Sequence, residues 1–196
     1  MADNPGLEAA GKLSGLEECD VSTTDGTILH VRAIRPNDAS RLVDAHGQLS
    51  LTTVHRRFFT AHPTLSEDEV ARFTNVDNVD RVALIALDGD SLVAVARYDR
   101  DPGTDEAEVA FVVVDAYQGR GLGTLLLEQL ASAARHNGIS TFTADVLLEN
   151  AAMMRVFRGS GYPVTSSLSQ GVFSIRFPIG REAADPSAQC GGPSTC

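Results

Sequence analysis

Residues 107–123, AEVAFVVVDAYQGRGLG, place an apolar strand before a short polar turn and a glycine-rich helix start. The first N–H groups of a helix have no partner within it, and the helix dipole adds partial positive charge there, so this end attracts phosphate oxygens. Gly119, Gly121 and Gly123 carry no side chain that would keep a phosphate away from these amides, and Arg120 adds a positive charge. The segment Gln118–Gly123 therefore predicts a pyrophosphate-binding turn.

The flanking segments favour a phosphate-binding turn over a turn that merely joins a strand to a helix. Residues 108–114 predict a strand, and residues 124–137 predict a helix whose apolar side chains share one face: Leu125, Leu126, Leu130, Ala133 and Ala134. Two other phosphate loops do not match. A Walker loop needs a lysine after its last glycine, and a dinucleotide-binding turn has the spacing G-x-G-x-x-G rather than the G-x-G-x-G found here.

These residues resemble those of a known superfamily. Gln118–Gly123 is similar to the Q/R-x-x-G-x-G/A signature of the GNAT N-acetyltransferases, which binds the pyrophosphate of acetyl-CoA, and Asn150, a short helix and Gly161-Tyr162 continue the likeness. The resemblance covers roughly residues 27–178. Three upstream segments resemble, more narrowly, the catalytic domain of bacterial protein lysine acetyltransferases of the Pat type: residues 55–59 (HRRFF), 66–74 (SEDEVARFT) and 79–84 (VDRVAL).

The resemblance implies a binding site for acetyl-CoA as the co-substrate. In this superfamily two strands splay before the phosphate-binding turn, which leaves backbone groups free for the pantetheine arm and the thioester carbonyl. Asn150 follows a strand, where its amide would bond the cofactor, cap the helix at residues 151–158, or do both. The residues expected to bind the cofactor are Val112, Val113, Val114, Gln118, Gly119, Arg120, Gly121, Leu122, Gly123, Thr124 and Asn150.

Glu108, at the start of the strand that leads into this turn, is the expected catalytic base. Acyl transfer to an amine needs a group that removes the ammonium proton. In Pat-like enzymes a glutamate at this position is thought to remove it through a water molecule, and the resemblance implies the same role for Glu108. Apolar neighbours would raise its pKa toward the working pH. The alternative is a solvated carboxylate at a strand end. Many GNAT enzymes have a tyrosine acid where this chain has Phe157, so no general acid is assigned.

Length and composition fit one domain with mobile ends. The chain has 196 residues, 43% of them hydrophobic, which suits one core in a domain of about 150 residues. Residues 1–26 are expected to be a mobile N-terminal segment, residues 27–180 the acetyltransferase domain and residues 181–196 a disordered tail. Neither a metal site nor a disulfide in the core is expected, because all three cysteines fall in these ends: Cys19, Cys190 and Cys196.

The charge of the chain argues against one class of partner. The formal net charge is −10 and the sequence pI is about 4.8. Nucleic acid is not an expected partner, because binding to the phosphate backbone needs a basic face, whereas an acidic surface favours cationic partners such as a protein with an exposed lysine. No apolar run approaches the roughly 20 residues of a membrane span, and the N-terminus lacks a signal-peptide pattern. A cytoplasmic protein is expected.

The order of the predicted elements indicates an α/β (α+β) fold with a mixed sheet and helices on both faces, and the resemblance implies that the sheet is mostly antiparallel. Residues 88–91, DGDS, predict a hairpin between two apolar strands, and Ser66 with Glu69 predicts a capping box. The expected strands cover residues 27–33, 82–87, 92–98, 108–114, 141–147 and 171–177, and the expected helices cover residues 38–49, 51–59, 66–73, 124–137 and 151–158.

The expected function is acetyl-CoA-dependent N-acetylation of lysine side chains of proteins. Direct transfer in a ternary complex is expected, because no cysteine in the predicted core offers an acyl-enzyme route. One alternative is a small-molecule amine acetyltransferase, which an enclosed acceptor pocket would favour, whereas an open groove would favour a protein substrate. The other is a non-catalytic acyl-CoA-binding regulatory module, against which Glu108 argues. The resemblance implies that Arg56 and Arg57 come from a segment that borders the acceptor site.

Overall fold

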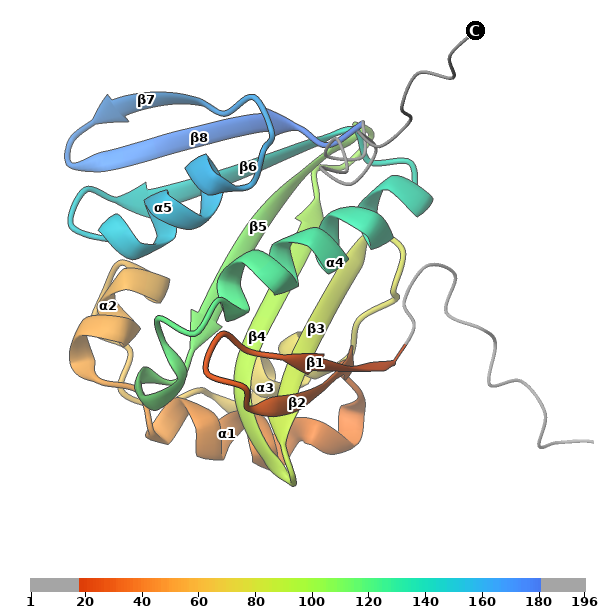
Figure 1. The fold of residues 1–196 in the computed structure, drawn as a ribbon, viewed down its shortest axis with the longest axis vertical. Coiled ribbons are helices and arrows are strands. Elements are labelled where there is room, and N and C mark those ends of the chain that lie inside the picture. Colours follow the sequence, from red (N-terminus) through yellow and green to blue (C-terminus); the bar gives the residue numbers. More distant parts are fainter. Residues whose placement is uncertain (1–17, 181–196) are drawn as a thin grey trace, which may run out of the picture.

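The structure is a computed structural model that describes residues 18–180. Its strands are β1 (Cys19–Ser22), β2 (Ile28–Ala33), β3 (Arg81–Asp88), β4 (Ser91–Arg100), β5 (Glu106–Val113), β6 (Thr141–Leu147), β7 (Thr165–Ser169) and β8 (Val172–Pro178). They form one sheet in the order β1-β2-β3-β4-β5-β6-β8-β7 (Figure 1). Neighbouring strands are antiparallel except β5 and β6, which run parallel.

Helices cover both faces of this sheet. They are η1 (Pro36–Asp38), α1 (Ala39–Gly47), α2 (Leu51–Phe58), α3 (Glu67–Thr74), η2 (Asp115–Tyr117), α4 (Leu122–His136) and α5 (Ala151–Gly159), where η marks a 3-10 helix. In Figure 1, α4 and α5 lie in front of the sheet, α1 and α3 lie behind it, and α2 lies beside β5. None of the helices formed by residues 18–180 has both the length and the apolar character that crossing a membrane requires.

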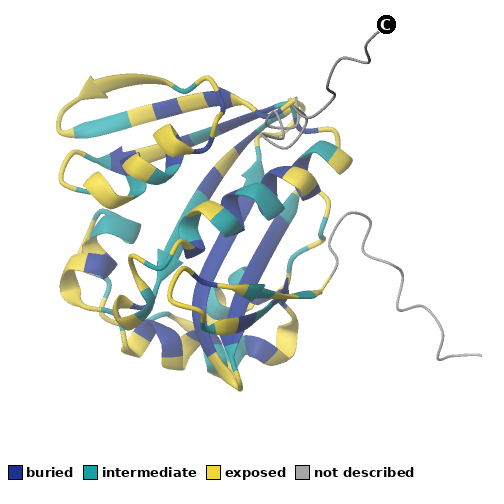
Figure 2. Ribbon diagram, in the orientation of Figure 1, coloured by how far each residue is buried: buried dark blue, intermediate teal, exposed yellow. Residues whose placement is uncertain are grey.

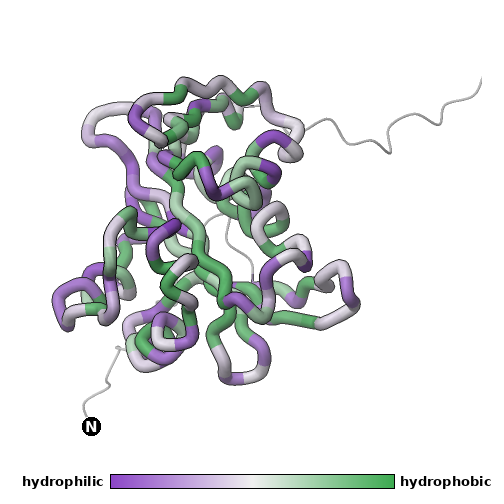
Figure 3. Tube along the Cα trace, turned by 90° about the vertical axis from the view of Figure 1, so that its left-hand side faces the viewer, coloured by the Kyte–Doolittle hydropathy of each residue, from purple (hydrophilic) through white to green (hydrophobic). Residues whose placement is uncertain are grey.

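The central strands are buried on both faces. Leu84 of β3 packs in the core beneath α4, and its neighbour Ile85 packs in the core beneath α1. Because successive side chains of a strand point to opposite faces, a strand covered on both sides reads as a continuous apolar run. Figure 2 shows β3 and β4 buried over most of their length, and Figure 3 shows the hydrophobic segments gathered in the middle of the molecule.

The expected fold is confirmed, and every expected strand and helix is present with its ends within two residues of the expected ones. Two strands were not expected. β1 lies in the segment 1–26, and the expectation that this segment is mobile is wrong for residues 19–22, which pair with β2. β7 is an exposed edge strand rich in serine, so it has no apolar alternation to reveal it. Residues 1–17 and the expected tail 181–196, with its two cysteines, lie outside the described residues.

Candidate active site

Strands β5 and β6 separate soon after they meet. Their parallel pairing covers only Glu106–Glu108 of β5 and Thr141–Thr143 of β6. Beyond Glu108, one edge of β5 pairs with β4, while the other edge borders a groove of about 380 Å³. The beginning of α4 and one side of α5 form further walls. The open edge of β5 therefore offers backbone N–H and C=O groups to a molecule in this groove, which we call the cofactor groove.

Free backbone amides line the entrance to α4. Among residues 18–180, the N–H groups of residues 119–124 donate to no protein acceptor, and the first bond of the helix runs from the Leu125 N–H to the Gly121 carbonyl at 3.2 Å. Gly119 and Gly121 have φ angles of +75° and +86°, a conformation that favours glycine. A row of unpaired amides at a helix N-terminus suits a phosphate group.

Gly123 is required for a different reason. A Cβ atom added at this position would lie 3.0 Å from Cγ2 of Val156, which belongs to α5. A Cβ atom at Gly121 would instead meet Cγ2 of Thr24 at 3.2 Å, in the β1–β2 turn. The space that glycine leaves at position 123 is thus filled by α5 and is not open to a phosphate.

Nine of the eleven expected residues line the cofactor groove: Val112, Val113, Gln118, Gly119, Gly121, Leu122, Gly123, Thr124 and Asn150. The Gln118 side-chain amide donates to the Val113 carbonyl at 3.0 Å and to Thr53 Oγ1 at 3.1 Å. Its backbone N–H donates to the Asp115 carbonyl at 3.2 Å, so it is not one of the free amides. Gln118 therefore ties the end of β5 to α2.

Arg120 and Val114, which were also expected to bind the cofactor, do not line the groove. The Arg120 guanidinium forms an ion pair with Asp25 at 2.9 Å, and its other nitrogen donates to the Ala116 carbonyl at 2.7 Å. Val114 is buried on the α1 side of the sheet, and its N–H donates to the Val93 carbonyl at 2.9 Å. The structure does not bring either side chain to the free amides.

Asn150 lies where it can serve both roles that the sequence left open, cofactor binding and helix capping. It lines the cofactor groove, and its Oδ1 accepts a hydrogen bond of 3.2 Å from the Met153 N–H, which caps α5. Its side-chain NH2 has no partner within the described part of the chain. Because the carbonyl and the amino group of an asparagine bond independently, capping leaves a donor for a ligand.

Glu108 lies where the cofactor groove meets a second groove. It lines a passage of about 60 Å³ together with Arg57 and Asn150, and it lines an open groove of about 550 Å³ together with Asp145. Loss of solvent raises the pKa of Glu108, and the Asp145 carboxylate raises it further, while Arg57 opposes the rise. A carboxylate with a raised pKa at this junction is suited to act as a base.

Two charged residues of the site were missed by the sequence analysis. Asp145 lies on β6, two residues beyond Thr143, and therefore faces the same side of the sheet. Arg155 lies on α5, where it lines the cofactor groove. Strand alternation would have identified Asp145 once its strand was placed beside β5. Arg155 is five residues from Asn150, which is not a helical repeat, so no local pattern would have identified it.

The structure offers no tyrosine acid to the passage among the described residues. Phe157 is 1% exposed and packs in the core. The Tyr162 hydroxyl donates to Glu128 at 3.2 Å, so this side chain packs beneath α4. Tyr117 does line the cofactor groove, but its hydroxyl donates to Asp88 at 2.7 Å.

The sequence around this site matches a known family. Residues 49–162, which include β5, the free amides and Asn150, match the acetyltransferase (GNAT) family. The chain belongs to this family. Acetyl-CoA fits its groove as the co-substrate.

Individual relatives and solved structures indicate which members of the family this chain resembles. Acetyltransferase Pat of Mycolicibacterium smegmatis is 33% identical over 140 residues, which is 69% of this chain and 41% of that protein, so the chain spans less than half of this relative. The GNAT domain of S. lividans PAT has a TM-score of 0.78 at 44% identity, covering 82% of this chain and 96% of that one. The yncA structure from Salmonella typhimurium, which contains acetyl-CoA, shares the fold, with a TM-score of 0.64, 20% identity and coverages of 82% and 98%. The resemblance to Pat-type acetyltransferases is confirmed.

Proposed function

We propose that the chain transfers the acetyl group of acetyl-CoA to lysine side chains of other proteins. The observation that carries this proposal is the open groove of about 550 Å³ that meets the cofactor groove at Glu108. Its carboxylates come from Asp101, Glu108 and Asp145. We call this surface the acidic groove.

The charge of the acidic groove favours an ammonium group. Its one arginine, Arg176, forms an ion pair with Glu106, which cancels much of its positive charge. The three carboxylates are therefore the main uncompensated charges. A concave surface of one sign concentrates ligands of the opposite sign, and a lysine side chain carries the required positive charge.

The shape of the acidic groove supports a protein rather than a small amine as the acceptor. Every residue that lines it comes from strands β5 to β8 or from the turn after β4, and no helix of the described chain contributes a wall. A surface without a lid leaves room for the rest of a large substrate on either side of the inserted lysine. A small amine would be held better in an enclosed pocket.

Glu108 would remove the proton from the lysine ammonium, directly or through one water molecule. Glu108 lines the passage and the acidic groove at once, as Asp145 of β6 also does, and among the carboxylates of β5 it alone lines either space. Its raised pKa makes it a stronger base than an ordinary glutamate. Loss of solvent has the largest effect on the pKa of Glu108, and Asp145 and Arg57 then shift it in opposite directions.

The remaining groups would bind and orient the co-substrate. Acetyl-CoA supplies a thioester, at whose carbonyl carbon the neutral amine forms a C–N bond while the C–S bond breaks. The free edge of β5 beyond Glu108 would donate to the carbonyl oxygen, and the amides of residues 119–124, with Arg155 nearby, would hold the phosphates. The leaving thiolate would take a proton from water, because Phe157 cannot donate one.

Substitution of Glu108 by glutamine tests this proposal. Gln keeps the size of the side chain but cannot accept a proton, so we expect turnover on a lysine-bearing protein to fall by about 10²- to 10⁴-fold with acetyl-CoA affinity nearly unchanged. The defect should shrink between pH 6 and pH 9, because more of the lysine is then already neutral. Mass spectrometry of acetylated lysines gives the rates, and titration calorimetry gives the affinity.

Glu67→Gln is the control, since Glu67 is an exposed glutamate on α3 that lines neither the passage nor the acidic groove. We expect its turnover to stay within about two-fold of the unmodified chain, as for most surface substitutions. Unchanged turnover in Glu108→Gln across this pH range would remove Glu108 from the mechanism. Acetylation of small amines alone, with no protein lysine modified, would overturn the choice of acceptor.

A further inference from the structure

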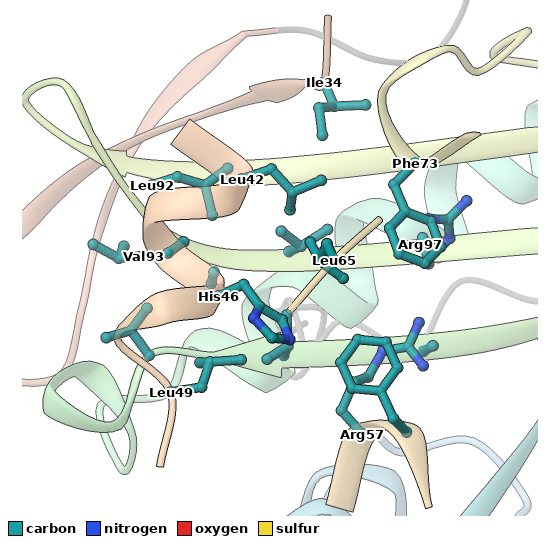
Figure 4. A pocket seen from close by; sticks show the side chains of 17 residues that line it. Ile34, Leu42, His46, Leu49, Arg57, Leu65, Phe73, Leu92, Val93 and Arg97 are labelled. Atoms are coloured by element: carbon teal, nitrogen blue, oxygen red, sulfur yellow. The ribbon is translucent and has the colours of Figure 1, made fainter. Parts of the chain in front are cut away.

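A separate cavity lies on the α1 side of the sheet, behind the thioester end of the cofactor groove. It has a volume of about 50 Å³ and is walled mainly by aliphatic side chains from α1, the turn that follows α1, β4 and β5, among them Leu42, Leu49, Leu92 and Val112 (Figure 4). A water molecule needs about 10–15 Å³ of such volume, so the cavity has room for about four atoms of that size. This is the size of a short aliphatic group with a polar end.

The polar side chains of this cavity are all nitrogen bases. They are His46, Arg57 and Arg97, and no carboxylate from residues 18–180 lines the cavity. Figure 4 shows Arg57 and Arg97 toward the end beside Phe73, whereas Leu92 and Val93 close the other end. The cavity is therefore apolar along its length and cationic at one end.

Arg97 is 5% exposed and incompletely paired. Its Nε donates to Asp99 at 3.1 Å and its guanidinium carbon lies 4.7 Å from the centre of the Phe73 ring, but its Nη2 is buried without a hydrogen-bond partner. Most buried donors in folded proteins are paired, and leaving one unpaired is costly. An unpaired guanidinium nitrogen in the wall of a cavity points to an anionic ligand.

Arg57 adds a second positive charge to the same end. It forms no ion pair with any described carboxylate, and burial lowers its pKa to about 10, with the repulsion of Arg97 contributing, although Glu108 and Asp99 oppose this. An ammonium group would meet two guanidinium groups here, so the lysine acceptor belongs in the acidic groove. A carboxylate would be attracted, because charge-assisted bonds from arginine to carboxylate are among the strongest in proteins.

The cavity shares two lining residues with the cofactor groove. Val112 and Arg57 line both spaces, and the backbone of Val112 belongs to the strand edge where the thioester carbonyl would lie. An acyl group held at that edge would extend its distal end past Val112 toward Arg57 and Arg97. The acetyl group is too short to extend past Val112 to the two arginines, whereas a three- or four-carbon acyl group is long enough.

Resting on the acyl transfer proposed above, we propose that the cavity receives the distal carboxylate of a dicarboxylic acyl-CoA, held between Arg57 and Arg97. The transfer step is unchanged. The lysine nitrogen bonds to the thioester carbon, the C–S bond breaks, the ammonium proton passes to Glu108 and the thiolate takes a proton from water. The distal carboxylate takes no part in the step, so the modified lysine changes from a positive to a negative charge.

Binding of acyl-CoA esters measured by titration calorimetry tests this inference without relying on turnover. Malonyl-CoA and isovaleryl-CoA have acyl groups of the same shape, and only the first carries a carboxylate; acetyl-CoA and succinyl-CoA complete the set. We expect malonyl-CoA or succinyl-CoA to bind at least ten-fold more tightly than isovaleryl-CoA. Arg97→Met should abolish this preference while leaving the affinity for isovaleryl-CoA and the unfolding midpoint nearly unchanged.

Arg81→Met is the matched control, because Arg81 also donates to Asp99, at 3.0 Å, but does not line the cavity. The preference for the dicarboxylic ester should survive in this variant. Equal affinity for the malonyl and isovaleryl esters in the unmodified chain would overturn the inference and leave acetyl transfer intact. Failure to bind any of the four esters would overturn the proposed function itself. Free malonate or succinate that binds through Arg97, with no preference among the esters, would overturn the assignment of the carboxylate to the acyl group.

Discussion

Glu108 lies at the residue where β5 stops pairing with β6, and this position explains its environment. The pairing ends at Glu108 and Thr143, so the carboxylate is flanked by protein on one side and by two grooves on the other. Asp145 raises its pKa and Arg57 lowers it, after the larger effect of lost solvent. Substituting Asp145 and substituting Arg57 should therefore shift the pKa of Glu108 in opposite directions, which tests whether Glu108 is the base.

Neutralising Asp145 and Arg57 in turn should move the pH profile in opposite directions. Asp145→Asn removes a negative charge, so the pKa of Glu108 falls and the acidic limb of kcat/KM moves to lower pH. Arg57→Met removes a positive charge, so the same limb moves to higher pH. Rates of lysine acetylation from pH 5 to pH 9 measure both shifts. Asp44→Asn, an exposed change on α1, should leave the limb in place, and shifts of the same sign in both variants would exclude Glu108 as the titrating base.

The sequence could place Glu108 on β5 and the glycine turn before α4, but not where every side chain points. Positive φ at Gly119 and Gly121 is a local property that glycine itself signals. Arg120 was expected beside the phosphate, yet its partner Asp25 comes from a turn of an unexpected hairpin. Side-chain partners that come from distant segments follow from the tertiary structure, and no local pattern predicts them.

At the scale of elements, the site depends on how closely α5 packs against the beginning of α4. Gly123 permits this approach, because a Cβ atom there would meet Val156 at 3.0 Å. The cofactor groove takes walls from both helices, so a change in their separation changes the groove.

Gly123→Ala should therefore weaken acetyl-CoA binding through helix packing, by about ten-fold, with a loss of about 1–3 kcal/mol in the free energy of unfolding, as overpacking typically costs. Val156→Ala in the same chain should restore both quantities, because the crowded methyl groups are gone. Calorimetry and urea unfolding give the two values. Gly121→Ala serves as the control that Val156→Ala should not rescue, since its contact is with Thr24. Binding that stays weak in the Gly123→Ala, Val156→Ala chain would mean that the added methyl group displaces the phosphate.

Two substitutions of Asn150 should separate capping from cofactor binding. Asn150→Ala removes the bond to the Met153 N–H and should cost about 1 kcal/mol of unfolding free energy. Asn150→Asp keeps an accepting oxygen at the cap but lacks the NH2 donor, so stability should stay within a few tenths of a kcal/mol while acetyl-CoA affinity falls. Urea unfolding and calorimetry measure the two effects. An Asn150→Asp variant with unchanged affinity would leave the residue as a cap alone.

Most elements could be predicted because their signals are local. Ser66 and Glu69 form the expected capping box at the start of α3, and the apolar runs of β3 and β4 form the expected hairpin. β1 and β7 could not, because a short edge strand is held by its neighbour and needs no apolar pattern of its own. The acidic groove takes part of its wall from β7, so the sequence could not predict the full extent of the groove without predicting that strand.

At the scale of the whole molecule, two charge environments lie side by side on the α1 face of the sheet, because Glu108 and Val112 are an even number of residues apart on β5 and so face the same side. The acidic groove lies over β5 to β8, and the cavity with Arg57 and Arg97 lies over β4 and β5, with Glu108 between them. This arrangement depends on α1 staying packed on the sheet, and a buried ion pair joins the two. Arg32 of β2 donates two bonds, of 2.7 and 2.8 Å, to Asp38 at the start of α1. The Asp38 side chain is 0% exposed and also accepts from the Arg35 N–H at 2.8 Å.

Removing the charge of Asp38 should therefore weaken the whole fold. Asp38→Asn leaves Arg32 buried without its counter-charge, and breaking such a pair typically costs about 3–5 kcal/mol of unfolding free energy, a large part of a domain's total. Burial opposes ionisation of Asp38, but the bonds from Arg32 and Arg35 outweigh it and hold its pKa below the usual value. A lowered pKa stabilises the folded chain above the unfolded value of about 3.9, and this contribution is lost as the pH falls through the folded pKa. The difference in unfolding free energy between the two chains should thus be full near pH 7 and shrink in acid, as urea unfolding from pH 3 to pH 7 would show.

Asp90→Asn, which removes a fully exposed partner of Arg41, should change stability by less than about 0.5 kcal/mol. A difference between Asp38→Asn and the unmodified chain that stays constant down to pH 3 would mean that the lost stability comes from packing rather than from the ionised pair.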